Sequence, residues 1–518
     1  LYGGRKIGNR QITKELTGFS LPADATGWAA KYKRNYTSSQ ESEFVKTRLN
    51  YLPADTVAGL PFLVEVDKQN YVAITEACID DYPGFYIGKG NSAQEKNQVL
   101  ATRLSPLPGE KEDGVKARFF EKMATPWRVI LVGDHPGRFI ETELIHSLNP
   151  PCAIEDTSWI KPGMCAWDHW WSGEVKMEMD VIKEYIDFAA EQGWPYMLID
   201  WQWYGPYNKA HADITKPAPQ LNMPEILEYA RSKNVRCWLW LYCTDVNKND
   251  SYKEAFALYE KWGIAGIKID FMDRDDQEIV NFLYRGAETC AKYKMMVDYH
   301  GICKPTGLQR TYPNVINYEG VHGLENMKWA EKTYDMPLYD VTIPFVRMVA
   351  GPMDYTQGAM RNAIRKNYAP IYTEPMSQGT RCHQLATYVI FESPLNMLCD
   401  NPSNYNREPE CTEFIANIPT VWEKTVALDG KVGEYVAIAR LHGDNWYIGA
   451  LTNWDAREVE LDLSFLGDGN YKLELFKDGI NADRAACDYK KEVIPVPADR
   501  KVKVKMAPGG GWAAKIYK

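Results

Sequence analysis

The sequence predicts a multidomain α/β and β chain, in which a central (β/α)8 barrel of the TIM type is flanked by two β-sandwich domains. Three observations predict it. Short alternating runs of apolar and polar residues fill the first part of the chain, strand-like runs each followed by a helix-like run fill the middle, and alternating runs return at the end. We place the domains at residues 1–153, 154–408 and 409–518.

The first domain is predicted from alternating segments that are separated by Gly, Pro and Asn turns, which is typical of a sandwich. These segments are "FLVEVD" (62–67), "NYVAITEA" (70–77), "GFYIGK" (84–89) and "RVILVGD" (128–134).

The barrel is predicted from seven or eight strands, most with helices between them, over about 250 residues. A doubly wound open sheet is the alternative, but no glycine-rich phosphate-binding motif follows the first strand. The predicted strands are 162–170, 196–203, 236–243, 266–273, 295–301, 314–321, 341–351 and 395–400. The predicted helices are 179–193, 223–234, 251–263, 276–294 and a helix near 380–393.

The last domain again shows strand-like alternation and no repeat. Its predicted strands are 435–443, 445–454, 458–467, 471–479, 501–508 and 511–518.

The composition excludes several classes of protein. A net charge of −9 argues against nucleic-acid binding, which needs clustered Lys and Arg, and no apolar run of about 18 residues predicts a transmembrane helix. The 11 cysteines show no metal-ligand spacing, so free thiols are expected. The 17 tryptophans and 32 tyrosines suit a site that stacks on flat rings such as sugars, although any single one is more often a core residue.

The fourth predicted strand ends in "GIKIDFMDRDD" (266–276). Because side chains alternate along a strand, Lys268 and Asp270 should share the face that points into the barrel mouth, whereas Ile267, Ile269 and Phe271 should face the helices. Burying a Lys–Asp pair is costly unless the pair is used or tightly bonded, so a functional role and a structural ion pair both remain open.

Three further aspartates follow in the same segment. We interpret Asp273, Asp275 and Asp276 as solvated loop charge, with Asp275 or Asp276 as the N-cap of the next helix.

Glu319 and Glu325 follow the sixth predicted strand. One of them together with Asp270 would meet the basic requirement of glycoside hydrolysis, in which one carboxylate acts at the anomeric carbon and the other moves a proton.

Other polar side chains at predicted strand ends could bind sugar hydroxyls or support the site through hydrogen bonds. They are Asp168, His169, Asp200, Asp245, Asp298 and His300 in the barrel. Trp167 lies beside them in the aromatic segment "AWDHWW". In the first domain Glu76 ends a strand, and Asp80 and Asp81 lie in a turn.

Several longer motifs, taken in order, carry a specific resemblance. "AGIKIDF", "CKPTGLQRTYPNVINYEG", "MVAGPMDYTQGAM" and "RCHQLATYVIFESPLNMLCD" resemble glycoside hydrolase family 97, most closely its retaining α-galactosidase branch. "TEACIDDYPGFY" and the last domain extend the resemblance over most of the chain.

The resemblance implies roles for individual residues. The family's inverting members have glycine where this chain has Asp270, and a glutamate base where it has Gly301 after His300. In the retaining branch the aspartate is the nucleophile, which implies that role for Asp270, and the "GxE" loop implies that Glu325 is the general acid/base.

A calcium site is also implied by the resemblance. Glu76, Glu319 and Glu325 match its carboxylate ligands, and Gly301 replaces one usual ligand. Substrate-binding roles are expected for Lys268, His300, Asp200 and Trp167, with Lys268 and the calcium ion helping to hold the substrate.

The resulting expectation is a retaining, exo-acting α-galactosidase that releases terminal α-galactosides through a galactosyl-enzyme intermediate. An α-glucosidase on the same scaffold and a non-catalytic carbohydrate-binding protein are the alternatives. The partner is an oligosaccharide or galactoside. Members of the family are typically exported, often to a bacterial periplasm, and carry a longer N-terminal sandwich, so we expect its first strands to be missing from this chain.

Overall fold

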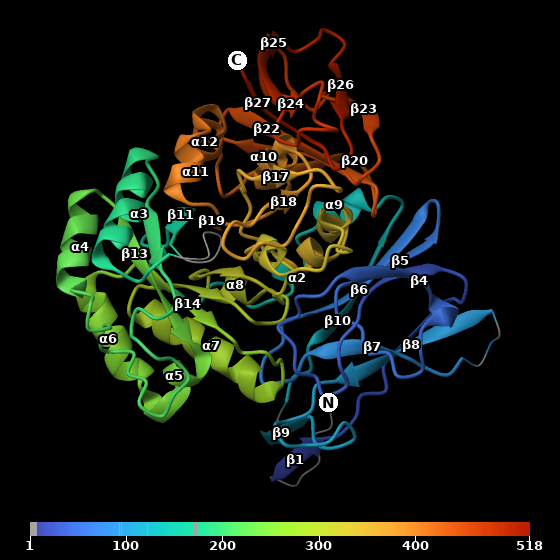
Figure 1. Cartoon of the computed structure of the whole chain (residues 1–518). Coiled ribbons are helices and arrows are strands. Elements are labelled where there is room, and N and C mark those ends of the chain that lie inside the picture. The colour runs from blue at the N-terminus through green and yellow to red at the C-terminus, as the bar shows by residue number, and fades with distance from the viewer. Residues whose placement is uncertain (1–7, 93, 95, 122, 169–174) are drawn as a thin grey trace. The chain divides into compact units, whose positions relative to one another are not determined.

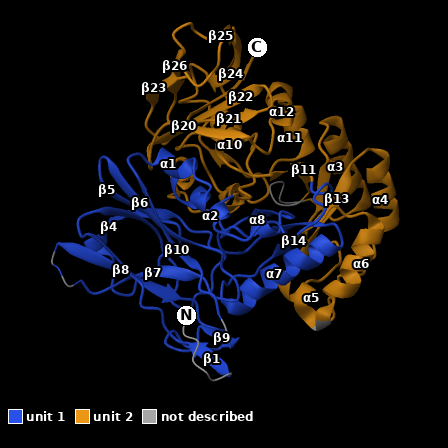
Figure 2. Ribbon diagram, turned by 180° about the vertical axis from the view of Figure 1, so that it is seen from behind, with its two compact units in different colours: residues 1–160, 269–322, 345–351 blue, residues 161–268, 323–344, 352–518 orange. Residues whose placement is uncertain are grey.

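The computed structural model describes residues 8–92, 94, 96–121, 123–168 and 175–518. The predicted site residue His169 therefore lies outside the described residues. The chain divides into two compact units, shown in blue and orange in Figure 2. Unit 1 comprises residues 1–160, 269–322 and 345–351, and unit 2 comprises residues 161–268, 323–344 and 352–518.

A parallel sheet of seven strands forms a nearly closed barrel and confirms the predicted fold class. Its order is β16-β15-β14-β13-β12-β11-β19, and the division between the units falls inside β14, after Lys268. The strands are β11 (Gly163–Trp167), β12 (Tyr196–Ile199), β13 (Arg236–Tyr242), β14 (Gly266–Asp270), β15 (Met296–Tyr299), β16 (Val315–Tyr318) and β19 (Leu395–Leu398).

One predicted strand, residues 341–351, is wrong. The segment forms two 3-10 turns, η4 (Ile343–Phe345) and η5 (Arg347–Ala350), and most of its side chains are buried. Pro344 has no N–H to donate and is poorly suited to a central strand. A short apolar run of this kind cannot be told from a buried helical segment by its pattern alone.

Unit 1 begins with antiparallel sheets, ordered β10-β6-β5-β3-β4, β2-β8-β7 and β1-β9. Their shared core includes Phe62, Ile74, Phe85 and Leu100, and Val280 of α7 packs into it. The strands are β1 (Asn9–Ile12), β2 (Gly18–Pro22), β3 (Thr26–Ala30), β4 (Phe44–Arg48), β5 (Phe62–Asp67), β6 (Asn70–Ala77), β7 (Phe85–Lys89), β8 (Asn97–Leu104), β9 (Ala117–Phe120) and β10 (Trp127–Gly133).

The helical elements of unit 1 are short apart from α7. They are η1 (Leu49–Tyr51), α1 (Gly137–Ile140), α2 (Leu144–Ser147), α7 (Gln277–Lys292) and α8 (Leu308–Thr311), with η5 in addition.

The helices of unit 2 include those that follow the first barrel strands (Figure 1). Sequence signals mark their ends: the Asn222 side chain accepts from the N–H of Glu225 at the start of α4, and Gly263, at φ +74°, ends α6. They are α3 (Met179–Glu191), α4 (Met223–Ser232), α5 (Cys243–Asn247), η2 (Lys248–Asp250), α6 (Tyr252–Trp262), η3 (Leu324–Lys328), α9 (Met336–Asp340), η4, α10 (Arg381–Ile390), α11 (Pro402–Asn406) and α12 (Pro409–Ala416).

The C-terminal part of unit 2 is a β domain that contains all six predicted strands. A six-stranded sheet, β20-β21-β22-β27-β24-β25, and the β23-β26 pair enclose an apolar core, and α10 packs on β22 and β27. The strands are β20 (Lys424–Lys431), β21 (Tyr435–His442), β22 (Asn445–Thr452), β23 (Arg457–Asp462), β24 (Lys472–Asp478), β25 (Tyr489–Pro495), β26 (Lys501–Met506) and β27 (Gly511–Tyr517), and the short pair β17 (Asn362–Ala363) and β18 (Ser377–Gln378) lies before α10 in sequence.

All eleven cysteines are free thiols, as expected. Among the described residues, no helix combines the length and the apolar character that crossing a membrane requires.

Candidate active site

Asp270 is the last residue of β14, and the strand residues before it are all buried. Ile267 and Ile269 are fully buried and Lys268 is 1% exposed, whereas Asp270 is only partly buried. The prediction that Phe271 shares the apolar face is wrong, because this side chain is 42% exposed and its φ is +64°. The strand ends at Asp270, so the alternation ends there too.

The backbone at Gly301 packs directly against the end of β14. Gly301 has φ +54°, and a Cβ at this position would lie 2.7 Å from the amide nitrogen of Phe271 and 3.1 Å from Asp270 Oδ1. The amide of Phe271 donates to that same Oδ1 at 2.7 Å. Any larger residue at 301 would therefore displace the backbone that holds the Asp270 carboxylate.

Both the backbone N–H and the carbonyl of Gly301 form hydrogen bonds. Its N–H donates to Glu319 Oε2 at 2.7 Å, and its carbonyl accepts from the N–H of Asp273 at 2.7 Å. The loop after β15 therefore positions both the end of β14 and the carboxylate that follows β16.

His300 lies between two carboxylates at the end of β15. Its Nδ1 is 3.3 Å from Glu319 Oε2, its Nε2 is 3.3 Å from Asp298 Oδ2, and its backbone N–H donates to the carbonyl of Ile269. Ligand atoms of Asp270, His300 and Glu319 all lie within 4.8 Å of one another. The structure thus gathers three of the predicted site residues at the ends of β14, β15 and β16.

Glu76, at the end of β6, is fully buried and is paired with two cations. One of its oxygens accepts from Arg128 at 2.7 Å, and the other accepts from Lys304 Nζ at 2.5 Å and from the N–H of Phe85. Burial alone would lower the pKa of Lys304, but the charge and hydrogen bond of Glu76, together with the nearby Cys303 and Asp275, outweigh burial and the pKa is raised. Lys304 therefore stays charged inside the protein.

These contacts bear on the expected calcium site. Calcium takes carboxylate and carbonyl oxygens in flexible geometry, and Glu319, in the cluster with Asp270, offers such an oxygen. Glu76 fits less well, because a calcium ion would have to displace Lys304 or Arg128 to reach its oxygens.

The three aspartates after Asp270 differ from the solvated charge that the sequence suggested. Asp276 is the N-cap of α7, since its Oδ1 accepts from the amides of Glu278 and Ile279. Asp275 is instead 1% exposed, and its Oδ2 accepts from Gln40 Nε2 at 3.1 Å.

Burial also changes the acidity of two of these groups. It raises the pKa of Asp275 to about 6 and that of Asp273 to about 6, with the charges of Asp270 and Glu319 adding to the shift of Asp273. The prediction of solvated charge failed because the residue that covers Asp275 lies 235 positions away in the sequence.

In unit 2, three predicted substrate-binding residues form one buried group. Lys268 Nζ lies 3.3 Å from Asp200 Oδ2 and 4.4 Å from the centre of the Trp167 ring, and Trp167 Nε1 donates to Asp200 at 2.7 Å. Asp168 accepts from the N–H of Asp200, and burial, reinforced by the charge of Asp200, raises the pKa of Asp168. These residues hold one another in place, and Trp167 is only 2% exposed.

Asp245, another predicted site residue of unit 2, lies in α5 after β13 and has a supporting position. Its Oδ2 accepts from the hydroxyl of Tyr204 and from the N–H of Asn208. It fixes the loop after β12 and leaves that oxygen little capacity for a substrate.

Glu325 lies in the first turn of η3 and is 7% exposed. Its helix is anchored at the start, where the N–H of Leu324 donates to the carbonyl of Tyr355 and the N–H of Asn326 donates to that of Gly323. A carboxylate on a short, anchored helix has a defined position, as a proton donor requires.

Two buried side chains near the candidate residues of unit 1 were missed by the sequence reasoning. Lys304 lies in the motif "CKPTG", and a lysine in a segment of small and apolar residues could have signalled a buried partner. Gln40 gave no signal, because its contacts with Asp275 and with the hydroxyl of Tyr86 are made across the fold.

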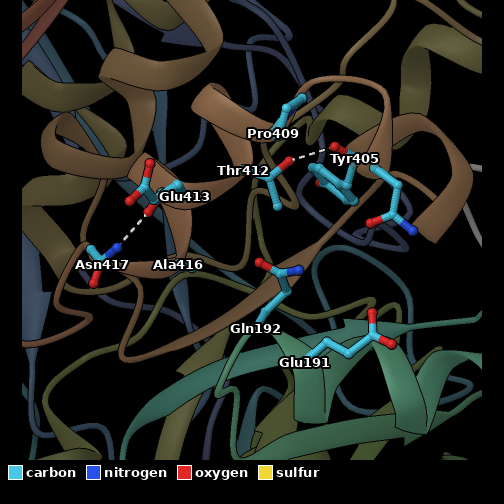
Figure 3. A pocket seen from close by; sticks show the side chains of 9 residues that line it. Glu191, Gln192, Tyr405, Pro409, Thr412, Glu413, Ala416 and Asn417 are labelled. Atoms are coloured by element: carbon cyan, nitrogen blue, oxygen red, sulfur yellow. Dashed lines mark hydrogen bonds between the residues drawn. The ribbon is translucent and has the colours of Figure 1, made fainter.

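A surface pocket of unit 2 contains none of the predicted site residues. It measures about 310 Å³ and lies among α3, α11 and α12 (Figure 3). Its lining is largely polar, and the side chains of Thr412 and Asn417 donate to carbonyls of their own segment, those of Tyr405 and Glu413.

Carboxylates at the strand ends of a parallel barrel are the groups that a glycoside-cleaving enzyme of the barrel type uses. Family models agree: "Glycosyl-hydrolase 97 N-terminal" matches residues 3–151, "Glycoside hydrolase 97" matches 163–321, and "Glycosyl-hydrolase 97 C-terminal, oligomerisation" matches 421–517.

Individual relatives match over nearly the whole chain. A retaining alpha-galactosidase of Bacteroides thetaiotaomicron is 44% identical, over 98% of this chain and 80% of that protein. A probable retaining alpha-galactosidase of Streptomyces bingchenggensis is 30% identical, over 91% and 69%. A solved family 97 enzyme from Pseudoalteromonas sp. strain K8, in complex with panose, is 29% identical with a TM-score of 0.87, over 98% of this chain and 81% of that one.

The chain belongs to glycoside hydrolase family 97 and is a glycoside hydrolase. The resemblance found in the sequence is thereby confirmed.

Proposed function

We propose that this glycoside hydrolase is a retaining, exo-acting α-galactosidase with Asp270 as its nucleophile and Glu325 as its general acid/base. The observation that carries the proposal is the packing of Gly301 against Asp270. A carboxylate stands at the end of β14, and the facing position on the next strand end has no side chain that could activate a water. The 44% identical relative that bears this activity in its name supports the sugar class.

The proposed reaction has two displacements. In the first, an oxygen of Asp270 forms a bond to the anomeric carbon while the bond to the leaving oxygen breaks, and Glu325 gives its proton to that oxygen. In the second, Glu325 takes a proton from water, whose oxygen attacks the anomeric carbon and releases Asp270. Two inversions restore the α configuration.

The surroundings of Asp270 support its role as the nucleophile. The Phe271 amide donates to one carboxylate oxygen of Asp270 and so fixes its direction. His300, between Glu319 and Asp298, is placed to bind a sugar hydroxyl.

We extend the proposal to a calcium ion with Glu319 as a carboxylate ligand. Glu325 resembles a ligand of the family's site as well, but it must carry a proton in the first step and is therefore assigned to proton transfer. When bound, calcium would supply positive charge beside the substrate. Glu76 is assigned instead to its ion pairs with Lys304 and Arg128. Export to a bacterial periplasm belongs to the same proposal and rests on family resemblance alone.

An NMR time course of the released sugar tests the proposal. With 4-nitrophenyl α-galactoside, α-galactose should appear first and β-galactose later by mutarotation. Initial β-galactose would overturn retention, and faster turnover of 4-nitrophenyl α-glucoside would favour the α-glucosidase alternative. Absence of turnover on both glycosides would favour a carbohydrate-binding protein.

A further inference from the structure

Two large aromatic side chains, Trp329 and Tyr372, lie together at the surface of unit 2. Trp329 directly follows η3, the 3-10 helix that carries Glu325. Trp329 is 45% exposed and Tyr372 is 44% exposed. Their ring centres are 6.3 Å apart and their planes differ by 29°, so the rings are stacked. We call this pair the aromatic platform.

The platform is held in a fixed orientation. Trp329 Nε1 donates to Asn326 Oδ1 at 3.1 Å, and the Trp329 backbone N–H donates to the carbonyl of the same asparagine. Lys328, itself 2% exposed, places its ammonium 4.2 Å from the centre of the Tyr372 ring. Rings that are already fixed lose little conformational freedom when they bind a ligand.

What distinguishes this pair from single exposed rings such as Trp127 is that its two exposed rings stack on each other. Single exposed aromatic residues are common on protein surfaces and need no explanation. Here, however, many of the tryptophans are fully enclosed, including Trp203, Trp238 and Trp240. The Trp329 ring nitrogen already donates to Asn326, and the Lys328 ammonium already contacts the Tyr372 ring. A ligand would therefore contact chiefly the flat apolar surface of the pair.

We propose that the aromatic platform binds the sugar ring of the leaving group, on the far side of the bond that is cleaved. The inference rests on the proposed function, in which Glu325 protonates the oxygen that departs with the leaving group. Three residues of η3 separate Glu325 from Trp329, so the backbone positions of the two are about 8 Å apart at the rise of a 3-10 helix. This backbone spacing is of the order of the length of one sugar ring.

The chemistry of the platform suits a pyranose ring. Such a ring presents C–H groups on its faces and hydroxyl groups at its rim, so an aromatic face can cover the apolar side while water or polar groups reach the rim. The platform would therefore select α-galactosides whose leaving group is itself a sugar, and it would leave the binding of the galactosyl ring unchanged.

The test compares two substrates that differ only in the leaving group. Melibiose loses a glucose, whereas α-galactosyl fluoride loses a fluoride ion and has nothing to stack on the platform. For Trp329→Ala and Tyr372→Ala, kcat/KM should fall about tenfold on melibiose and stay within about twofold on α-galactosyl fluoride. Trp329→Phe should keep most of the activity on melibiose.

Trp127→Ala is the matched control, because Trp127 is 57% exposed and lies in the first β domain. Equal losses of kcat/KM on both substrates, or no loss on melibiose, would overturn the proposed role of the platform. The proposed function would still stand in that case, because it is tested by turnover of α-galactosyl fluoride by the wild type. If the wild type cleaves neither substrate, the proposed function fails and the platform fails with it.

Discussion

The two β domains differ in what each contributes to the barrel segments of its own unit. The N-terminal β domain contacts the barrel segments of unit 1 through charged and polar side chains. Glu76 pairs with Lys304, which follows β15, and Gln40 donates a hydrogen bond to Asp275, which follows β14. The C-terminal β domain packs on α10 mainly through apolar residues, and Arg440 bonds there to the carbonyls of Val389 and Ile390.

The difference teaches that similar sheets can have different roles. A buried ion pair contributes little net stability, because desolvation of the charges offsets their attraction, but it fixes the position of the groups involved. An apolar interface with satisfied carbonyls stabilises without orienting any reactive group. Changes in the N-terminal β domain are therefore expected to alter both turnover and stability, whereas changes in the C-terminal one should alter stability alone.

The largest effect is expected from Gly301→Ala. Gly301 lies in unit 1, in the loop after β15, and packs against Asp270. The new Cβ would push on the Phe271 amide, so we expect kcat to fall about 10²–10³-fold with little change in KM. Gly263→Ala is the control, because Gly263 has a similar φ of +74° but open space around it. Full activity of Gly301→Ala would refute the positioning role.

Next in size is Glu76→Gln, which leaves Lys304 and Arg128 without their shared carboxylate. Breaking a buried pair in this way costs about 3–5 kcal/mol of unfolding free energy, and we expect kcat/KM to fall about 10–100-fold, as for other residues that orient a site. The control is Glu434→Gln in the C-terminal β domain, whose carboxylate pairs with Lys431 and Arg457 at the surface and should change both quantities little. Equal effects of the two changes would erase the contrast between the domains.

Particular residues show which features of the fold and the site could be predicted from the sequence. Sequence patterns located six of the eight strands of the C-terminal β domain, the strand that ends at Asp270, and a cap at the start of α7, because these features depend on neighbours in the chain. The strands β20 and β25 were not predicted. The burial of Asp275 and the pairing of Lys304 with Glu76 could not be read, because each depends on a partner more than 200 positions away. Pro344 was the residue in the sequence that argued against the strand predicted at 341–351.

A third prediction concerns pH and the C-terminal β domain. Burial raises the pKa of Asp478 to about 6, although the amides of Ala507 and Gly511 donate to it. A raised acid pKa stabilises the fold fully below the unfolded value and less as pH rises through 6, by about 3 kcal/mol in total. Thermal unfolding of Asp478→Asn should therefore lack this decline between about pH 4 and pH 7. An unchanged pH profile would contradict the assignment, and kcat at pH 7 should not change.

The smallest effect is expected from Arg440→Met, which leaves two carbonyls at the end of α10 without a donor. We expect a loss of about 1–3 kcal/mol in unfolding free energy, seen as a lower Tm, and unchanged kcat/KM of the folded enzyme. Reduced turnover at full folding would show that the C-terminal β domain also acts on the site.

The central claim is that Asp270 forms the covalent intermediate, and trapping that intermediate tests it most directly. A fluorinated α-galactosyl fluoride should react with the enzyme, and mass spectrometry of its peptides should find one fluorogalactosyl group on the peptide that contains Asp270. The adduct should be absent from Asp270→Ala. A label on Glu319 or Glu325 instead, or turnover of the reagent by Asp270→Ala at the wild-type rate, would contradict the account.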